Sequence, residues 1–194
     1  MELLFSNRVS KAFADKVKDI SGPLAIEPDW LMFLMDWESA GTLSPSKENP
    51  YGCVGLIQFC ADLPGGTYKT INGRQYSLQS IKMMSPEDQL DVVSEYMKEV
   101  QRDKGKFADY YQLYFAILFP KAYEQSNDYV LNTSTNNVFD INNNGQITVG
   151  EVKQYLDNRV KLTVPTAYWP VFFKKKTSSV YIGERSYSGH SLPC

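Results

Sequence analysis

The sequence predicts a mainly α-helical domain that carries a small β-hairpin and loop region. Residues 28–37 and 107–119 are apolar on almost every side, a pattern typical of helices buried in a core. Residues 41–84 are instead rich in Gly, Pro, Ser, Asn and Thr, which favours loops and turns. At 194 residues the chain is long enough for one well-cored domain. We assign residues 1–162 to this domain and treat residues 163–194 as a C-terminal extension packed on it.

The composition narrows the classes of function. Hydrophobic residues make up 43% of the chain and charged residues 22%, as in ordinary globular proteins. The net charge of −2 lacks the basic excess on which phosphate binding depends, so we expect no nucleic-acid partner. No apolar run approaches the roughly 20 residues that span a bilayer. Residues 1–8 have neither a basic start nor a long apolar run, so we expect no ordinary secretory signal. We also expect a monomer.

Helices are expected where apolar residues recur at helical spacing. A Gly-Pro pair at 22–23 should end the first of them, and Ser85 followed by Pro86 is a helix start. The expected helices cover residues 8–20, 28–37, 85–103, 107–119 and 152–160.

A short hairpin is expected inside the loop region. Apolar and polar residues alternate around Tyr68, Ile71 and Tyr76. The dipeptide Asn72-Gly73 lies between the two runs, and it favours a tight turn at the tip. The hairpin and the loops before it should form one wall of a cleft.

The cysteines and the histidine suggest no metal or nucleophile chemistry. Three cysteines leave at least one unpaired, and no Cys-x-x-Cys or His/Cys cluster indicates zinc. Cys53 and Cys60 could pair across the loop or remain two separate buried thiols, and we expect the second. Cys194 and the one histidine, His190, lie in the C-terminal extension outside any motif.

Glu38 is the candidate general acid. It follows the apolar segment 28–37 and leads directly into a Ser/Gly/Pro loop. This arrangement can hold a carboxyl group partly desolvated beside a cleft, with its pKa raised, so that it donates a proton near neutral pH. Taken alone, a glutamate at a helix end is more often a solvated surface residue.

The stretch that begins at Glu38 resembles the signature of the goose-type lysozyme and soluble lytic transglycosylase family. The resemblance is close over residues 28–60 and loose over residues 85–125. It implies a lysozyme-like α+β fold in which the hairpin and loop region lines the cleft. The matching residues are Glu38-Ser39, Pro45, Asn49-Pro50-Tyr51-Gly52 and Gly55-Leu56-Ile57-Gln58-Phe59.

The resemblance implies a mechanism with a single carboxyl group. Glu38 would protonate the leaving glycosidic oxygen, and the substrate's own N-acetyl group would stabilise the developing cation. Glu38 would then deprotonate the muramic 6-hydroxyl to give a 1,6-anhydro product. Gln58 would hold the substrate, Ser39 would help to orient it, and Gly55 would let the backbone approach the glycan. A lysozyme would instead hydrolyse the same bond, with Glu48 or Asp62 as a second carboxylate.

The chain departs from the family at the end of its fourth expected helix. The family usually has Ala-Tyr-Asn-Ala-Gly there, with the tyrosine close to the catalytic glutamate, whereas this chain has Phe119-Pro120 in place of Tyr-Asn. Tyr114 or Tyr123 could supply a phenol to the substrate instead, and Tyr114 is included among the candidate site residues. A tyrosine at helical spacing is more often part of the core.

Residues 140–151 match the EF-hand calcium loop, with oxygen-bearing side chains at positions 1, 3 and 5, glycine at 6, an apolar residue at 8 and glutamate at 12. Only two of the expected ligands carry formal charge, so the affinity should be modest, toward about 10⁻⁴ to 10⁻³ M. We expect Ca²⁺ to act as a structural staple, with the entering helix short or absent. The expected ligands are Asp140, Asn142, Asn144, Gln146 and Glu151.

The end of the chain is basic, with Lys174-Lys175-Lys176 after an aromatic run. It could form a patch for the anionic cell wall or a partner protein. We favour the alternative that it is a terminal strand or coil covering the core.

The leading functional prediction is a peptidoglycan lytic transglycosylase or muramidase that cleaves the MurNAc–GlcNAc β-1,4 bond, with calcium bound structurally. The alternatives are a chitinase or chitosanase of the same fold, and a non-catalytic phage structural or wall-binding module. The enzyme would act on the bacterial cell wall in the periplasm. The absence of a signal fits a phage endolysin, a virion-carried enzyme or a protein exported by a secretion machine.

Overall fold

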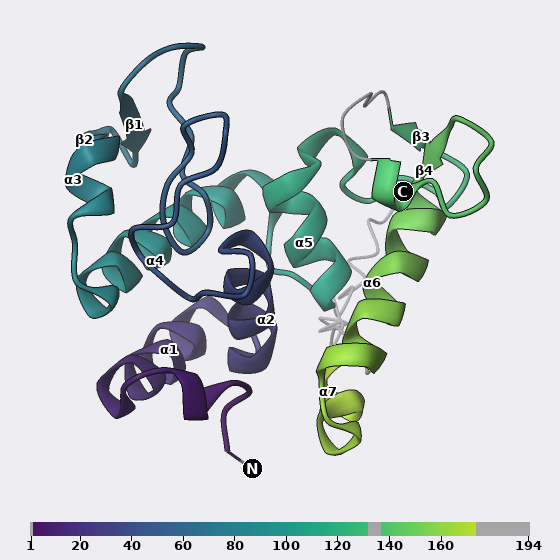
Figure 1. The fold of residues 1–194 in the computed structure, drawn as a ribbon, viewed down its shortest axis with the longest axis horizontal. Helices are drawn as coiled ribbons and strands as arrows, with labels where there is room; N and C mark the ends of the chain where they lie inside the picture. Colours follow the sequence, from purple (N-terminus) through teal and green to yellow (C-terminus); the bar gives the residue numbers. More distant parts are fainter. Residues whose placement is uncertain (1, 132–136, 174–194) are drawn as a thin grey trace, which may run out of the picture.

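The computed structural model describes residues 2–131 and 137–173. Over these residues the protein is mainly helical, with two small antiparallel sheets. Figure 1 shows the hairpin β1–β2 toward one end of the long axis and the strand pair β3–β4 toward the other, with helices between them. The mainly α prediction with a hairpin is confirmed, and the β3–β4 pair is an addition to it.

The helices are α1 (Lys11–Leu24), α2 (Pro28–Glu38), α3 (Leu78–Lys82), α4 (Pro86–Lys104), α5 (Tyr110–Leu118), α6 (Val149–Thr163) and α7 (Trp169–Phe173). The short 3₁₀ helices are η1 (Ser6–Arg8), η2 (Pro120–Ala122), η3 (Asn137–Phe139) and η4 (Thr166–Tyr168). The strands are β1 (Tyr68–Ile71), β2 (Arg74–Ser77), β3 (Val130–Leu131) and β4 (Ile147–Thr148).

Helix α2 is the centre of the core. All six residues from Trp30 to Met35 are at most 3% exposed, which explains why the segment is apolar on every side. Pro28 starts the helix, where its missing N–H has no helical partner to lose. Helices α1 and α5 pack on α2, and α4 contacts both of them. The position of Glu38 is therefore set by the most buried element described.

Helix α1 runs further than the sequence indicated. The Gly22-Pro23 pair was expected to end it, but the helix continues to Leu24, with Pro23 inside its last turn. Leu24 is buried, and its carbonyl accepts a hydrogen bond from Gln101 Nε2 at 2.8 Å. Packing and this bond offset the loss of one helical hydrogen bond at proline.

The hairpin is confirmed with its predicted turn. Ile71 pairs with Arg74 across Asn72-Gly73, and both turn residues have positive φ, 52° and 77°, as a tight two-residue turn requires. The side chain of Asn72 donates to the Glu95 carbonyl at 3.0 Å, which attaches the hairpin tip to α4.

The other predicted helices are also present, with shifted ends. Helix α5 begins at Tyr110 instead of residue 107, because Asp109 accepts a hydrogen bond from Gln112 N at 2.9 Å and caps it. Helix α6 begins three residues before the predicted residue 152, because Thr148 and Glu151 form a capping box. Before the EF-hand-like loop the structure has only η3, in agreement with a short or absent entering helix.

The described part of the extension covers the core as helices and not as the expected strand or coil. Phe172 is buried, with ring centroids 5.4 Å from Phe33 and 5.5 Å from Tyr110. Trp30 Nε1 donates to the Val171 carbonyl at 2.9 Å. Residues 174–194, including Lys174–Lys176, His190 and Cys194, lie outside the described residues.

Candidate active site and candidate calcium loop

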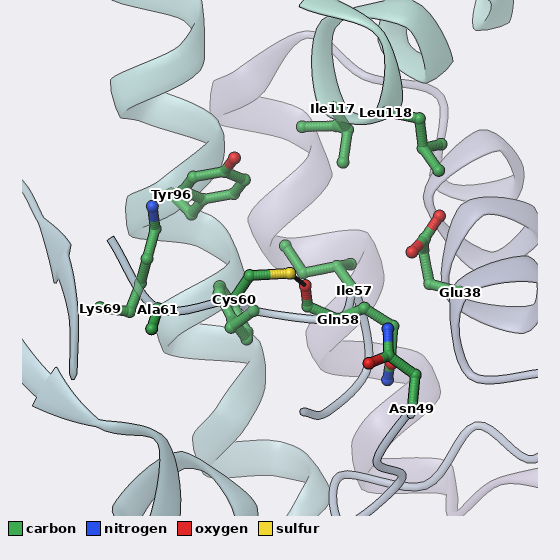
Figure 2. Close-up of a pocket in the computed structure, with 11 residues that line it drawn as sticks. Glu38, Asn49, Ile57, Gln58, Cys60, Ala61, Lys69, Tyr96, Ile117 and Leu118 are labelled. Carbon is green, nitrogen blue, oxygen red and sulfur yellow. Dashed lines mark hydrogen bonds between the residues drawn. The ribbon is translucent and has the colours of Figure 1, made fainter. Parts of the chain in front are cut away.

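A pocket of about 290 Å³ lies beside the C-terminal end of α2. Glu38 forms one wall, and Tyr96 of α4 and Lys69 of β1 form the opposite one (Figure 2). Ile117 and Leu118, at the end of α5, lie across from the loop that carries Gln58. Segments far apart in the sequence thus converge on one carboxyl group.

The Glu38 carboxyl group is partly desolvated. Its Oε1 is buried and has no hydrogen-bond partner among the described residues. Burial raises the pKa of Glu38 to about 8, because the charged form loses its solvation. The group therefore keeps its proton at neutral pH and can donate it to a bound molecule.

Ser39 and Arg8 fix the turn that follows Glu38. Ser39 is fully buried, and its hydroxyl donates to the Met35 carbonyl at 2.7 Å and accepts from Leu43 N at 2.8 Å. Arg8 forms an ion pair with Asp36 at 2.8 Å and donates to the carbonyl of Gly41. Ser39 thus has a positioning role in place of the substrate contact expected from the resemblance.

Gln58 lines the pocket, and the two ends of its side-chain amide differ in their partners. Its Nε2 donates to the carbonyls of Gly55 at 2.9 Å and Lys47 at 3.2 Å. These two bonds fix which end of the amide is nitrogen, so Oε1 faces away from the carbonyls. Oε1 is buried without a partner among the described residues. The role of Gln58 in holding a substrate stays a prediction.

Gly55 faces the protein interior. A Cβ at this position would lie 2.4 Å from Gln89 Oε1, and φ is +90°. Gln89 is fully buried, and it accepts from Leu56 N at 2.6 Å and donates to the carbonyls of Pro45 and Ile81. Gly55 does not line the pocket, and the structure explains it by this close packing instead of by an approach to a glycan.

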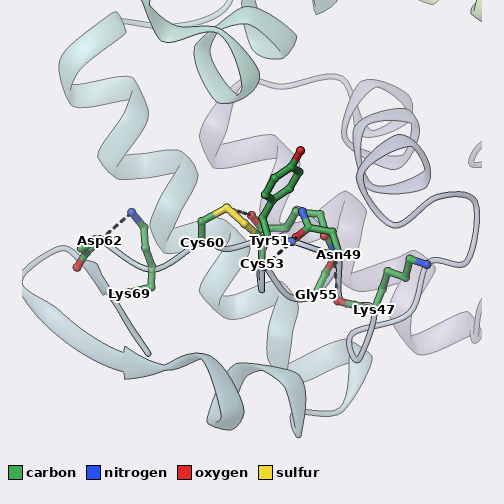
Figure 3. The surroundings of a disulfide bond; sticks show 9 residues. Lys47, Asn49, Tyr51, Cys53, Gly55, Cys60, Asp62 and Lys69 are labelled. Atoms are coloured by element: carbon green, nitrogen blue, oxygen red, sulfur yellow. Dashed lines mark hydrogen bonds and ion pairs between the residues drawn. A yellow bond between two sulfur atoms is a disulfide. The ribbon is translucent and has the colours of Figure 1, made fainter. Parts of the chain in front are cut away.

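Cys53 and Cys60 form a disulfide, so the expectation of two separate thiols is wrong. Val54 and Phe59 form an antiparallel bridge, which brings the flanking cysteines to a Cα–Cα distance of 4.2 Å. Figure 3 shows the bond beside Asn49, whose Oδ1 accepts from Cys53 N at 3.0 Å. The disulfide closes the turn that carries Gln58.

Of the two candidate tyrosines, Tyr114 is the one that lies near Glu38. It is 2% exposed, its hydroxyl has no partner among the described residues, and its ring centroid is 6.2 Å from that of Trp37. Burial raises the pKa of Tyr114 well above its usual value, and the charge of Glu38 adds to the effect. Tyr123 instead donates to the Lys104 carbonyl at 3.1 Å.

The two candidate second carboxylates are paired with lysines. Glu48 forms an ion pair with Lys82 at 2.5 Å, and Asp62 forms one with Lys69 at 3.0 Å. Asp62 also accepts from Thr70 N at 2.7 Å, and these bonds lower its pKa. Neither residue lines the pocket, in which Glu38 is the one acid among the described lining residues.

Sequence reasoning did not single out several residues of this site or of its support, among them Gln89, Lys69 and Arg8. Gln89 stood inside the loosely matching segment, but a glutamine on a helix gives no sign of burial. Lys69 is identifiable only once the hairpin is folded against α4. Arg8 lies in a segment that carried no motif at all.

The EF-hand-like loop has a defined shape. Asp140 accepts from Asn144 N at 3.0 Å and from Gly145 N at 2.9 Å, and Gly145 has a φ of +81°. Asn142 accepts from Asn144 N, and Asn144 accepts from Gln146 N, at 2.9 and 2.8 Å. No group of three or more His, Cys, Asp and Glu that could hold a metal occurs in the described chain. A cation here would depend on amide oxygens as well as on two carboxylates.

Comparison with known proteins gives no relative. No family model matches the chain, and searches of curated proteins and of solved structures find no match. No helix in the described segments has the length and apolar character needed to cross a membrane.

Proposed function

We propose that the protein cleaves the β-1,4 bond between MurNAc and GlcNAc in peptidoglycan, with Glu38 as the general acid. The observation that carries the proposal is the Glu38 carboxyl group, which lines a pocket, has a buried oxygen without a partner among the described residues and has a pKa raised to about 8. A glycosidic bond needs a proton on its leaving oxygen, and a desolvated carboxyl group supplies one at neutral pH.

The surroundings favour a mechanism with one carboxyl group. A hydrolase with two carboxylates would need the second within about 5 to 10 Å of the first. The pocket offers no second acid among its described lining residues, and lysines hold Glu48 and Asp62 outside it. These observations support a lytic transglycosylase, in which Glu38 takes up the 6-hydroxyl proton after giving up its own.

The other groups of the pocket suit an N-acetylated sugar. Gln58 Oε1 can accept a hydrogen bond from an N–H or O–H group of the glycan. Tyr96, Ile117 and Leu118 offer apolar surface to a sugar face and exclude water from the carboxyl group. A lysozyme-like fold is part of the proposal, supported by a helix-terminal glutamate that faces a hairpin and loop wall.

Mass spectrometry of fragments released from purified peptidoglycan tests the proposal. Glu38→Gln keeps the shape of the side chain and loses the transferable proton, so cleavage should fall by about 10²- to 10⁴-fold. Glu48→Gln and Asp62→Asn are matched controls, because they make the same change at carboxylates outside the pocket, and both should keep activity.

The fragments also separate the alternatives. Anhydro-muramic ends support transglycosylation, and reducing ends indicate a lysozyme. Cleavage of chitin oligomers without cleavage of peptidoglycan would indicate a chitinase. Release of no fragment by a folded protein would overturn the proposal and favour a non-catalytic module.

A further inference from the structure

Side chains on both flanks of the 140–151 loop pack behind the candidate acid. Phe139 directly precedes the loop, and Tyr155 lies one helical turn after its last residue. Their ring centroids are 5.0 Å apart, and those of Phe139 and Tyr155 are 6.4 Å and 5.7 Å from Trp37. Trp37 is the residue before Glu38. Both flanks of the loop therefore contact the residue that precedes the candidate acid.

The chain of aromatic contacts continues from Phe139 to Tyr114, whose buried hydroxyl lies near Glu38. Phe139 packs on Phe119 with centroids 5.7 Å apart, and Phe119 packs on Tyr114 at 6.4 Å. We call Trp37, Tyr114, Phe119, Phe139 and Tyr155 the aromatic wall. Two of its five members, Phe139 and Tyr155, lie in the segments that enter and leave the loop.

One carboxylate at the end of the loop has a buried oxygen without a hydrogen-bond partner among the described residues. Glu151 is 8% exposed, and its Oε2 accepts from Thr148 N and Thr148 Oγ1, both at 2.9 Å. These bonds fold the carboxylate back over the end of the loop. Its Oε1 is buried and has no partner among the described residues. A buried carboxylate oxygen without a partner is costly unless a cation binds it.

We propose that the 140–151 loop binds one calcium ion and that the bound ion holds the aromatic wall behind Glu38, so that glycan cleavage depends on calcium. Calcium binding and the ordering of the aromatic wall do not depend on the proposed function. The calcium dependence of glycan cleavage rests on it. The loop spacing, the glycine at position 6 and the all-oxygen donor set suit calcium better than a smaller ion that demands strict octahedral geometry.

The physical route runs through the start of α6. Ile147 pairs with Leu131 in the small sheet, and Val149 and Val152 are buried. Asp140 and Glu151 would hold the ion between them, and an ion held there would fix the first turn of α6 against this sheet. Tyr155 lies one turn further along α6, so its contact with Trp37 is fixed as well. Without the ion, Glu151 Oε1 would stay buried with no partner among the described residues, and the turn would lose the stabilisation that a cation adds.

The first measurement is calcium binding to the Glu38→Gln protein, which does not depend on catalysis. Calorimetry should show one site, with a Kd of about 10⁻⁴ to 10⁻³ M. The melting temperature should rise by about 5 to 10 °C at calcium a hundredfold above Kd. Asp140→Asn should abolish both effects, whereas Asp128→Asn, the same change at an exposed acid outside the loop, should keep them. Magnesium at equal concentration should bind more weakly.

The second measurement compares the effect of calcium on the aromatic wall with its effect on glycan cleavage. Calcium should change tryptophan emission in the Glu38→Gln protein with the same Kd, and Trp37→Phe should remove that change. In the otherwise unmodified protein, EDTA should lower cleavage at least tenfold at a temperature where circular dichroism shows the chain still folded. Tyr155→Leu should bind calcium within about threefold of the normal affinity, yet reduce the ratio of cleavage with calcium to cleavage with EDTA toward one.

The outcomes distinguish calcium binding, the coupling of the ion to the aromatic wall, and the proposed function. No heat of binding and an unchanged melting temperature would overturn the proposal entirely. Binding without a Trp37 signal and without an effect of EDTA on cleavage would leave a metal site and refute the coupling. A protein that binds calcium and shows the Trp37 signal, but releases no fragment in any condition, would support the coupling to the wall and refute the proposed function.

Discussion

Glu38 and Glu151 each bury one carboxylate oxygen that has no partner in the described part of the chain, but their surroundings differ. Glu38 lies at the C-terminal end of α2, and neither a hydrogen bond nor an ion pair to another described residue holds its carboxyl group. Glu151 lies in the first turn of α6, where its second oxygen accepts two hydrogen bonds from Thr148. A helix N-terminus and N–H donors favour a negative charge, whereas burial at a helix C-terminus disfavours it. The first environment suits a proton donor, and the second suits a ligand for a cation.

The largest expected effect on stability comes from Glu38. Its pKa is about 8 when folded and about 4.5 when unfolded, so between these values the folded protein holds a proton that the unfolded chain has released. Stability from this group is therefore full below pH 4.5 and falls as the pH rises to 8. Glu38→Gln removes this loss. The variant should gain stability over the natural protein with rising pH, by at most about 5 kcal/mol above pH 8.

Urea unfolding of both proteins at pH 5 and pH 8.5 measures this difference. Glu48→Gln makes the same substitution at a glutamate paired with Lys82 outside the pocket. An equal pH trend in the two variants would contradict the desolvation of Glu38, and with it the contrast to Glu151.

The sequence predicted the parts of this comparison that depend on local pattern. The apolar helix ending at Glu38, the Asn72-Gly73 turn and the spacing of residues 140–151 are each encoded by neighbouring residues. The sequence could not predict that Ser39 turns inward, or that Gly55 is required by Gln89, since both depend on contacts between distant segments. The Cys53–Cys60 bond was missed for the same reason, because the Val54–Phe59 bridge depends on two positive-φ residues, Gly55 and Gln58.

The next effect compares two glycines, Gly55 in the loop that carries Gln58 and Gly145 in the 140–151 loop. Gly55 and Gly145 both have positive φ, +90° and +81°, so alanine strains the backbone at both, by about 1 kcal/mol. Gly145 has no atom within 4 Å of an added Cβ, whereas Gly55 has Gln89 at 2.4 Å. Gly55→Ala must also displace a buried amide that makes three hydrogen bonds, so it should lose about 3 kcal/mol in total.

Chemical unfolding in EDTA measures both variants without metal effects. Gly55→Ala should also impair cleavage, because Gly55 accepts from the Gln58 amide. Similar losses of stability in the two variants would mean that Gln89 moves aside at little cost, and that Gly55 needs another explanation.

A third effect compares the closures of the two loops. The Cys53–Cys60 bond closes the pocket loop covalently over a sequence separation of 7, whereas the 140–151 loop would be closed by an ion. Closing a loop of this size stabilises by about 2.5 kcal/mol in the chain-entropy model. The double change Cys53→Ser and Cys60→Ser should therefore lower the free energy of unfolding by about that amount and leave the response to EDTA unchanged. Cys194→Ser is the control and should change neither. If the cysteine pair altered the EDTA response, the two closures would not be independent.

The smallest effect compares two buried tyrosines of α5, Tyr114 near Glu38 and Tyr110 bonded to α6. Tyr110 donates to Asp157 Oδ1 of α6 at 2.8 Å, so Tyr110→Phe should cost about 1 kcal/mol of stability and leave cleavage unchanged. The Tyr114 hydroxyl has no such partner, so Tyr114→Phe should leave stability unchanged or raise it slightly. If the phenol hydrogen-bonds to the substrate or to Glu38 during cleavage, the rate should fall about tenfold, which corresponds to about 1.4 kcal/mol. Thermal melts and fragment release measure both quantities in each variant. A stability loss in Tyr114→Phe equal to that in Tyr110→Phe, with cleavage intact, would make Tyr114 an ordinary core residue.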